Sequence, residues 1–133
     1  MEILNIVYNF LYFKSENKEI RKPIFFENSR VPALLSYLAP IDIYAIALGP
    51  FVWCREEMDE VVKNHETIHF HQQLELLFIG QWFLYVMCWL ICLIKHKDGA
   101  VAYRMNPFEQ EAYDNEDNLE YLKTRKLWAW RKY

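Results

Sequence analysis

The pentad His65-Glu66-Thr67-Ile68-His69 constrains the fold of this chain more than any other part of its sequence. It lies in a stretch that we expect to be helical. Residues four apart on a helix differ by about 40° around its axis, so both imidazoles project from one face and can converge on one Zn²⁺. The carboxylate of Glu66 can then hydrogen-bond a water molecule beside the ion. The pentad therefore predicts a helix that bears two zinc ligands, His65 and His69, and a general base, Glu66.

The composition narrows the classes of protein to consider. The 133 residues are expected to form one domain, residues 1–133, with a core from 31 to 125. The net charge is −3 and the basic residues are scattered, which excludes a nucleic-acid footprint. The hydrophobic fraction of 53% is high for a soluble protein, and residues 31–53 and 74–94 are nearly free of charge. The three cysteines are an odd number without paired spacing, so no disulfide framework is expected.

The N-terminal segment, residues 1–22, is predicted to be amphipathic and to be retained. It contains an apolar stretch up to Phe13 but lacks the basic start and the small-residue cleavage site of a secretory signal. We expect a helix that either packs on the core or lies on a membrane surface.

Two short elements are expected ahead of the pentad. Residues 14–30 read as a polar connection, and residues 31–40 suit a short helix bounded by prolines. Residues 41–54 read as one bent strand or a tight hairpin, with the bend at Gly49-Pro50. We expect this element at a sheet edge, where it either pairs with an extended peptide or simply covers the core.

The apolar run after the pentad is the second strong constraint. Leu76–Ile94 could form about 28 Å of helix and is a transmembrane candidate, followed by the basic Lys95-His96-Lys97. A straight helix over residues 60–97 would place Lys97 about 42 Å from His69. A break within residues 80–88, with Gly80 as the first choice, would instead give two legs of about 22 Å that run out and back. A metal ligand beyond this run therefore requires a helical hairpin.

A third zinc ligand is needed, and it is sought on a helix predicted for residues 107–116. Asn106 followed by Pro107 is a helix start, with asparagine as the N-cap. Glu75 is a poor candidate, because it lies about 120° from His69 around the helix. Glu109 and Glu111 are both candidates, and Glu109 is preferred.

The segments HETIHFHQQLE and PFEQEAY resemble the HExxH zincin metalloprotease superfamily, in its branch with a glutamate ligand. They also resemble small bacterial proteins that share an HExIHxxQ box, an apolar hairpin and an FExEAY element. The resemblance covers residues 43–125. It implies a zincin-like core in which His65, His69 and Glu109 hold zinc and Glu66 is the base. Membrane-embedded members often carry an aspartate four positions after the ligand glutamate, where this chain has Tyr113.

Other polar residues near the pentad receive supporting roles. We expect Gln72 or Gln73 to hydrogen-bond one of the ligands. His71 lies about 200° from His69 on the helix, so it is not expected to share the metal. Candidates to stabilise an oxyanion are Tyr103, Arg104 and Tyr113.

The expected fold is mainly α, a minimal α+β zincin-like arrangement. It would combine the pentad helix, an apolar helical hairpin, a glutamate-bearing helix and one short edge strand or hairpin. The expected function is that of a zinc-dependent peptidase that acts on a peptide or protein substrate and associates with a membrane. One alternative is a non-catalytic, membrane-associated structural or interaction protein whose pentad binds metal without turnover, or binds none. The other is an accidental pattern on a packed helix. The sequence leaves the substrate and the oligomeric state open.

Overall fold

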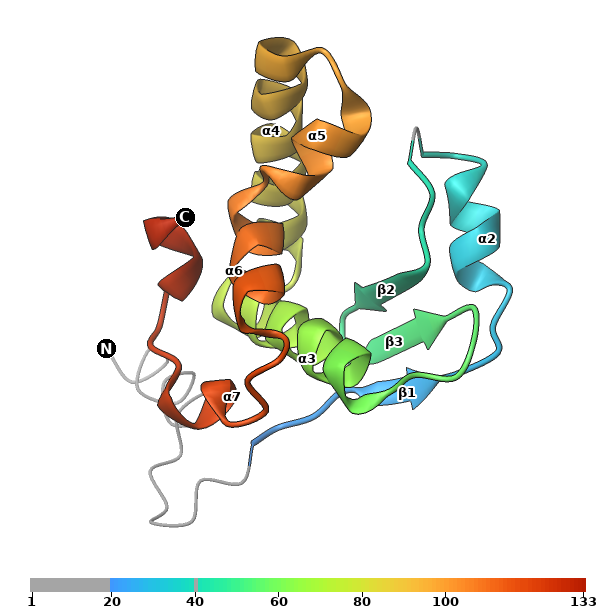
Figure 1. The fold of residues 1–133 in the computed structure, drawn as a ribbon, viewed down its shortest axis with the longest axis vertical. Coiled ribbons are helices and arrows are strands. Elements are labelled where there is room, and N and C mark those ends of the chain that lie inside the picture. The colour runs from blue at the N-terminus through green and yellow to red at the C-terminus, as the bar shows by residue number, and fades with distance from the viewer. Residues whose placement is uncertain (1–19, 40) are drawn as a thin grey trace.

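The computed structural model describes residues 20–39 and 41–133, so most of the predicted N-terminal amphipathic segment lies outside the described residues. The described chain is mainly helical with a small sheet, as expected, and this sheet has three strands where one strand or a hairpin was predicted (Figure 1). In chain order the elements are β1 (Ile24–Phe26), α2 (Val31–Ser36), β2 (Ala45–Leu48), β3 (Phe51–Cys54), α3 (Glu60–Glu75), α4 (Ile79–His96), α5 (Gly99–Arg104), α6 (Pro107–Asn115), α7 (Tyr121–Thr124) and the 3-10 helix η1 (Ala129–Lys132).

The sheet has the strand order β1-β3-β2. Strands β2 and β3 form the expected antiparallel hairpin, with Gly49 in its turn at a φ of 60°. β1 pairs in parallel with β3, and this strand lies within the polar connection predicted for residues 14–30, where no strand was expected. A strand of three residues is too short to be recognised from an alternation of apolar and polar residues. The strand that directly precedes α3 is consequently the middle strand, and β2 takes the edge position.

The two faces of the sheet have different surroundings. The register places Val52 and Cys54 of β3 on the same face as Ala47 of β2. These side chains are buried and form one core cluster together with Met58 and with Val62 of α3. Helix α3 therefore covers this face, and the sheet supports the helix that carries the pentad.

A sharp corner separates α3 from α4 at residues 76–78, earlier than the predicted break within 80–88. Leu77 and Phe78 both have positive φ, of 52° and 61°. Leucine and phenylalanine rarely adopt this conformation, so the local sequence favours Gly80 as the breaker. Phe78 closes the corner by donating its backbone N–H to the carbonyl oxygen of Gln73, at 2.7 Å. A local backbone hydrogen bond, and not a glycine, therefore closes the turn.

Beyond the corner the chain runs out along α4 and returns through α5 and α6, which descends onto α3 (Figure 1). Asn106 is the N-cap of α6 as predicted, since its side chain accepts a hydrogen bond from the N–H of Phe108. At the other end of α6, the side-chain amide of Asn64 donates to the carbonyl oxygens of Asn115, Glu116 and Asn118. Asn106 thus caps one end of α6, and Asn64 ties the other end to α3.

Candidate metal centre

Three side chains from two helices converge where α6 meets α3. His65 and His69 lie one turn apart on α3, and Glu109 lies in the first turn of α6. Their side chains are 9%, 9% and 4% exposed. The Nε2 atoms of the two histidines are 3.1 Å apart, and Glu109 Oε2 lies 3.5 Å from that of His65 and 3.3 Å from that of His69. The structure therefore brings together the three residues that the sequence nominated as ligands.

These three distances suit a zinc ion. Zinc takes nitrogen and oxygen ligands tetrahedrally at about 2.0–2.1 Å, which places the ligand atoms about 3.3 Å from one another. Glu109 Oε2 is buried and has no hydrogen-bond partner within the described part of the chain. A buried carboxylate oxygen without a donor needs a cation or a water molecule to offset its desolvation. The donor set and the spacing of its atoms could hold one Zn²⁺.

Each histidine has a hydrogen-bond acceptor on its outer nitrogen. His65 Nδ1 lies 2.7 Å from Glu116 Oε2, and His69 Nδ1 lies 2.8 Å from the side-chain oxygen of Gln72. A histidine that donates from Nδ1 presents the lone pair of Nε2 to the centre. The prediction that Gln72 or Gln73 hydrogen-bonds a candidate ligand is confirmed for the contact of Gln72 with His69. Glu116 was missed, although it lies about two helical turns beyond Glu109.

Glu111, the rival third ligand, points to a different group of side chains. It is fully buried and accepts hydrogen bonds from Arg125 and Tyr121. It also accepts from the side-chain nitrogen of Gln72, at 3.0 Å. This contact fixes the orientation of the Gln72 amide, so that its oxygen faces His69. Glu111 therefore lies behind the histidine and not at the centre.

Two further polar residues of α3, Gln73 and Glu75, have partners away from the candidate metal centre. Glu75 is paired with Arg125, whose guanidinium joins Glu75 to Glu111. Gln73 donates to the carbonyl of Ala47 and accepts from the N–H of Gly49, which ties α3 to the β2–β3 turn. Both residues therefore support the packing of α3.

Tyr85 of α4 is a further residue that the sequence did not single out. Its hydroxyl donates to Glu109 Oε1 at 2.7 Å. One oxygen of Glu109 is thereby engaged, and Oε2 is left to face the two histidines. Tyr85 sits in an apolar run whose pattern is that of a packed or lipid-facing helix, so only the folded hairpin brings it to the site.

Burial and charge perturb the acidity of the cluster. Burial raises the pKa of Glu109, but the neighbouring His69 and His65 outweigh it and hold this pKa well below its usual range. Burial lowers the pKa of His69, but the negative charge of Glu109 raises it to about 9. The cluster is therefore a strongly coupled carboxylate–imidazole group.

Glu66 is buried beside this cluster. Its Oε2 atom has no hydrogen-bond partner within residues 20–39 and 41–133. Burial raises the pKa of Glu66 above its ordinary value, although the charges of His65 and His69 act to lower it. A carboxylate with a raised pKa is a better base near neutral pH than an exposed one.

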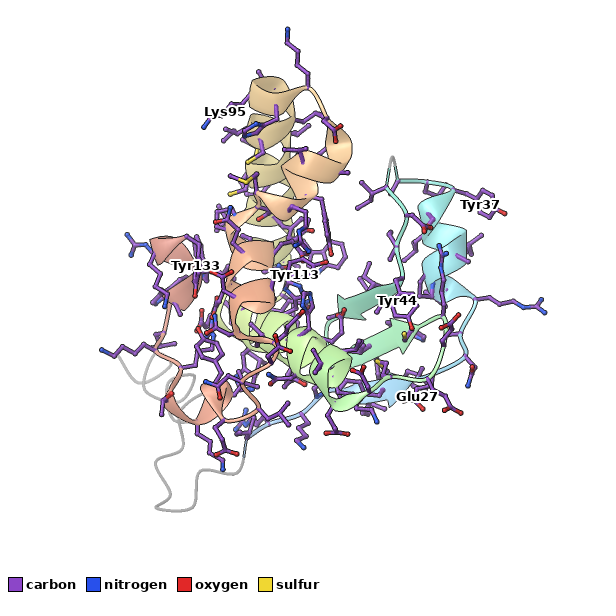
Figure 2. The ribbon with its side chains drawn as sticks, viewed as in Figure 1. Glu27, Tyr37, Tyr44, Lys95, Tyr113 and Tyr133 are labelled. Atoms are coloured by element: carbon purple, nitrogen blue, oxygen red, sulfur yellow. The ribbon has the colours of Figure 1, made fainter. Side chains whose placement is uncertain are left out.

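The three residues proposed to stabilise an oxyanion form one group of contacting side chains next to His65. The Tyr113 ring packs edge-on against the His65 ring with centroids 4.7 Å apart, and the Arg104 guanidinium lies 3.8 Å from the Tyr113 ring centroid. Tyr103 contacts Tyr113 at 6.4 Å between centroids. Figure 2 labels Tyr113 where α6 faces α3. His71 lies outside the cluster, with Nε2 2.9 Å from the Arg21 carbonyl oxygen.

Comparison with known proteins leaves the family of this chain open. No protein-family model matches the sequence. No match is found among curated proteins or among solved structures either.

Proposed function

We propose that this protein is a zinc-dependent peptidase of the zincin type, in which His65, His69 and Glu109 hold the metal. The observation that carries the proposal is a set of three buried ligand atoms at tetrahedral spacing beside the buried carboxylate of Glu66. Structural zinc sites usually have four protein ligands, whereas catalytic sites have three and leave one position for water or substrate. The resemblance of the pentad and the FEQEAY segment to glutamate-ligand zincins supports the same assignment.

The reaction would be the hydrolysis of a peptide bond. A bound zinc ion supplies Lewis-acid activation of water and of the scissile carbonyl. Glu66 takes a proton from the water as the water oxygen bonds to the carbonyl carbon, and it delivers this proton to the amine nitrogen as the C–N bond breaks. Glu116 and Gln72 hold the imidazoles in orientation, and Tyr85 holds Glu109. Arg104 and Tyr113 lie next to His65, where they could face a developing negative charge.

The proposal includes association with a membrane. α4 is long and apolar enough to cross one by length and composition alone, with a mean hydropathy of 1.4 over 18 residues, of which 6% are buried. The proposed substrate is accordingly a peptide or protein segment that reaches the site near a membrane.

The alternative is a metal site without turnover in a membrane-associated structural or interaction protein. The observation that favours it is the burial of all three ligands, since a catalytic site must admit a substrate. This alternative keeps the same metal ligands and gives Glu66 no chemical role.

Replacing Glu66 with Gln separates the two functions. The substitution preserves the size of the side chain and removes the base. A peptidase should keep one zinc per chain and lose peptide cleavage by about a hundredfold or more. Glu60→Gln, in the exposed first turn of the same helix, is the control and should leave cleavage unchanged. Cleavage that survives in Glu66→Gln, or an active-site zinc that is lost with it, would contradict the assignment of Glu66 as base.

A further inference from the structure

Helix α4 has an unusually broad apolar face that the described protein does not cover. Eight of its apolar side chains are exposed. They are Ile79, Trp82, Phe83, Val86, Met87, Leu90, Ile91 and Ile94. At 3.6 residues per turn these eight positions fill a sector of about 180° around the helix axis. We call this set the outer face of α4.

The opposite side of α4 faces the protein. Gln81 is buried there, and Tyr85 bonds Glu109. The indole nitrogen of Trp89 donates to the carbonyl of Gly99 at 3.3 Å. The polar groups of α4 are thus turned toward α5 and α6, so the metal centre and the outer face lie on opposite sides of one helix.

The width of the outer face bears on what covers it. A helix that pairs with another helix needs a seam narrower than the stripe of about 100° that faces an ordinary core. A sector of about 180° leaves a wide apolar margin on either side of such a seam. A helix half-immersed in lipid instead presents one full half of its circumference to the acyl chains.

The borders of the outer face fit a lipid surface as well. Trp82 lies at one edge of the sector, where an indole can reach the headgroup level. Lys95 and Lys97 are exposed at the end of α4 that lies far from the sheet, as Figure 2 shows for Lys95. Two lysines at this end favour phospholipids with a negative charge.

We propose that the outer face of α4 lies in the surface of an anionic phospholipid bilayer, with the helix axis along the membrane plane. This rests on the membrane association in the proposed function and specifies its face, orientation and lipid class. The charged residues of the hairpin tip, Lys95 to Asp98, then remain in the headgroup region. The metal centre stands about one helix diameter, roughly 10 Å, from the lipid. The substrate segments that can reach the metal centre are then those that emerge from the same membrane surface.

The test is flotation of the full chain with vesicles of phosphatidylcholine, with and without phosphatidylserine. Wild type should float with both and more strongly with phosphatidylserine. Phe83→Asp and Ile91→Asp should each reduce binding by about tenfold or more, because an apolar side chain no longer enters lipid. Leu34→Asp on α2 is the matched control, since Leu34 is 64% exposed and Phe83 is 65% exposed. It should float like wild type.

A separate variant tests the contribution of the two lysines to membrane binding. Replacing Lys95 and Lys97 with Gln should weaken binding to phosphatidylserine vesicles by about fivefold per lysine and leave binding to pure phosphatidylcholine unchanged. Equal loss on both kinds of vesicle would overturn the preference for anionic lipid.

Other results would overturn the proposal as a whole. Flotation of Phe83→Asp and Ile91→Asp at the wild-type level would do so, as would an equal loss in Leu34→Asp. A wild type that stays out of the vesicles and forms a dimer that Phe83→Asp dissociates would assign the outer face to a second copy of the chain. Zinc content measured on the same samples distinguishes a failure of the peptidase proposal from a failure of the membrane proposal. A chain that floats without zinc refutes the peptidase alone, and a chain that binds zinc without floating refutes the membrane face alone.

Discussion

Glu116 accepts a hydrogen bond from Nδ1 of His65 across 2.7 Å, although the two residues lie 51 positions apart in the chain. Glu116 is the C-cap residue of α6, whose first turn carries Glu109. This short helix therefore carries one proposed metal ligand in its first turn and, at its other end, the carboxylate that orients His65, a second proposed ligand. Tyr113 stands four positions after Glu109, and Glu116, seven positions after Glu109, makes the contact to the histidine.

Replacing Glu116 with Gln should weaken zinc binding by about 10- to 100-fold, because the neutral amide orients His65 less firmly and makes its imidazole a weaker ligand. The measurement is a competitive titration with a chromophoric chelator. The control is Glu120→Gln, which removes an exposed carboxylate of the same region that is paired with Lys123. An unchanged zinc affinity in Glu116→Gln would show that the contact has no part in holding the metal.

Glu109 and Glu111 should respond differently to the same substitution. Glu109→Gln should lower the zinc content from one ion per chain to nearly none, as measured by metal analysis. Glu111→Gln should retain zinc but lower the free energy of unfolding by about 3 kcal/mol, because Arg125 loses one of its two buried partners. Denaturant unfolding of the metal-loaded protein measures the second effect. Loss of zinc from Glu111→Gln with normal stability would reverse the assignment of the third ligand.

Tyr85→Phe should destabilise the centre without disturbing the helix. Removal of the hydroxyl leaves Glu109 Oε1 buried without its donor, which costs about 1–3 kcal/mol. The loss should register as a lower melting temperature and a weaker zinc affinity. Tyr44→Phe provides the comparison, because that hydroxyl makes an exposed contact of 3.4 Å to Glu56 and lies outside the centre. If both variants melt like wild type, the Tyr85 contact does not hold Glu109.

Zinc affinity should rise with pH up to about 9. The negative charge of Glu109 outweighs burial and raises the pKa of His69 to about 9, so the metal-free protein holds a proton there at neutral pH. A ligand histidine must release that proton, and the apparent dissociation constant should fall by about tenfold per pH unit below 9. Calorimetry in buffers of different ionisation enthalpy counts the protons released. An affinity that is flat across this range would show that His69 is already neutral.

The stability of the metal-free protein should change in the opposite direction. The pKa of His69 is higher in the folded chain than the ordinary 6.5 of an unfolded one. Its contribution to folding is therefore fully present below pH 6.5 and is lost as the pH rises through about 9. Thermal melts of the metal-free His69→Gln variant, compared with the metal-free wild type, isolate this group. A wild-type melting temperature that rises relative to the variant over this range would refute the assignment.

Several features of the fold were predictable because their signals are local. The pentad, with Asp59 as N-cap of its helix, marks α3, and Asn106-Pro107 marks the start of α6. Gly49 marks the hairpin turn because its φ of 60° suits glycine. Capping, helix periodicity and turn chemistry act over a few residues, so they can be read without knowledge of the rest of the chain.

The tertiary structure decided what depends on contacts between distant residues. Glu109 and Glu111 share one predicted helix and differ by about 200° around its axis, so only the packing of α6 on α3 determined which one faces the histidines. The same packing brought Tyr85 and Glu116 to the site. The corner at Leu77 and Phe78 runs against the preference of both residues for negative φ. The sequence by itself determined the helices and the chemical groups they carry, and long-range packing determined which of these groups meet.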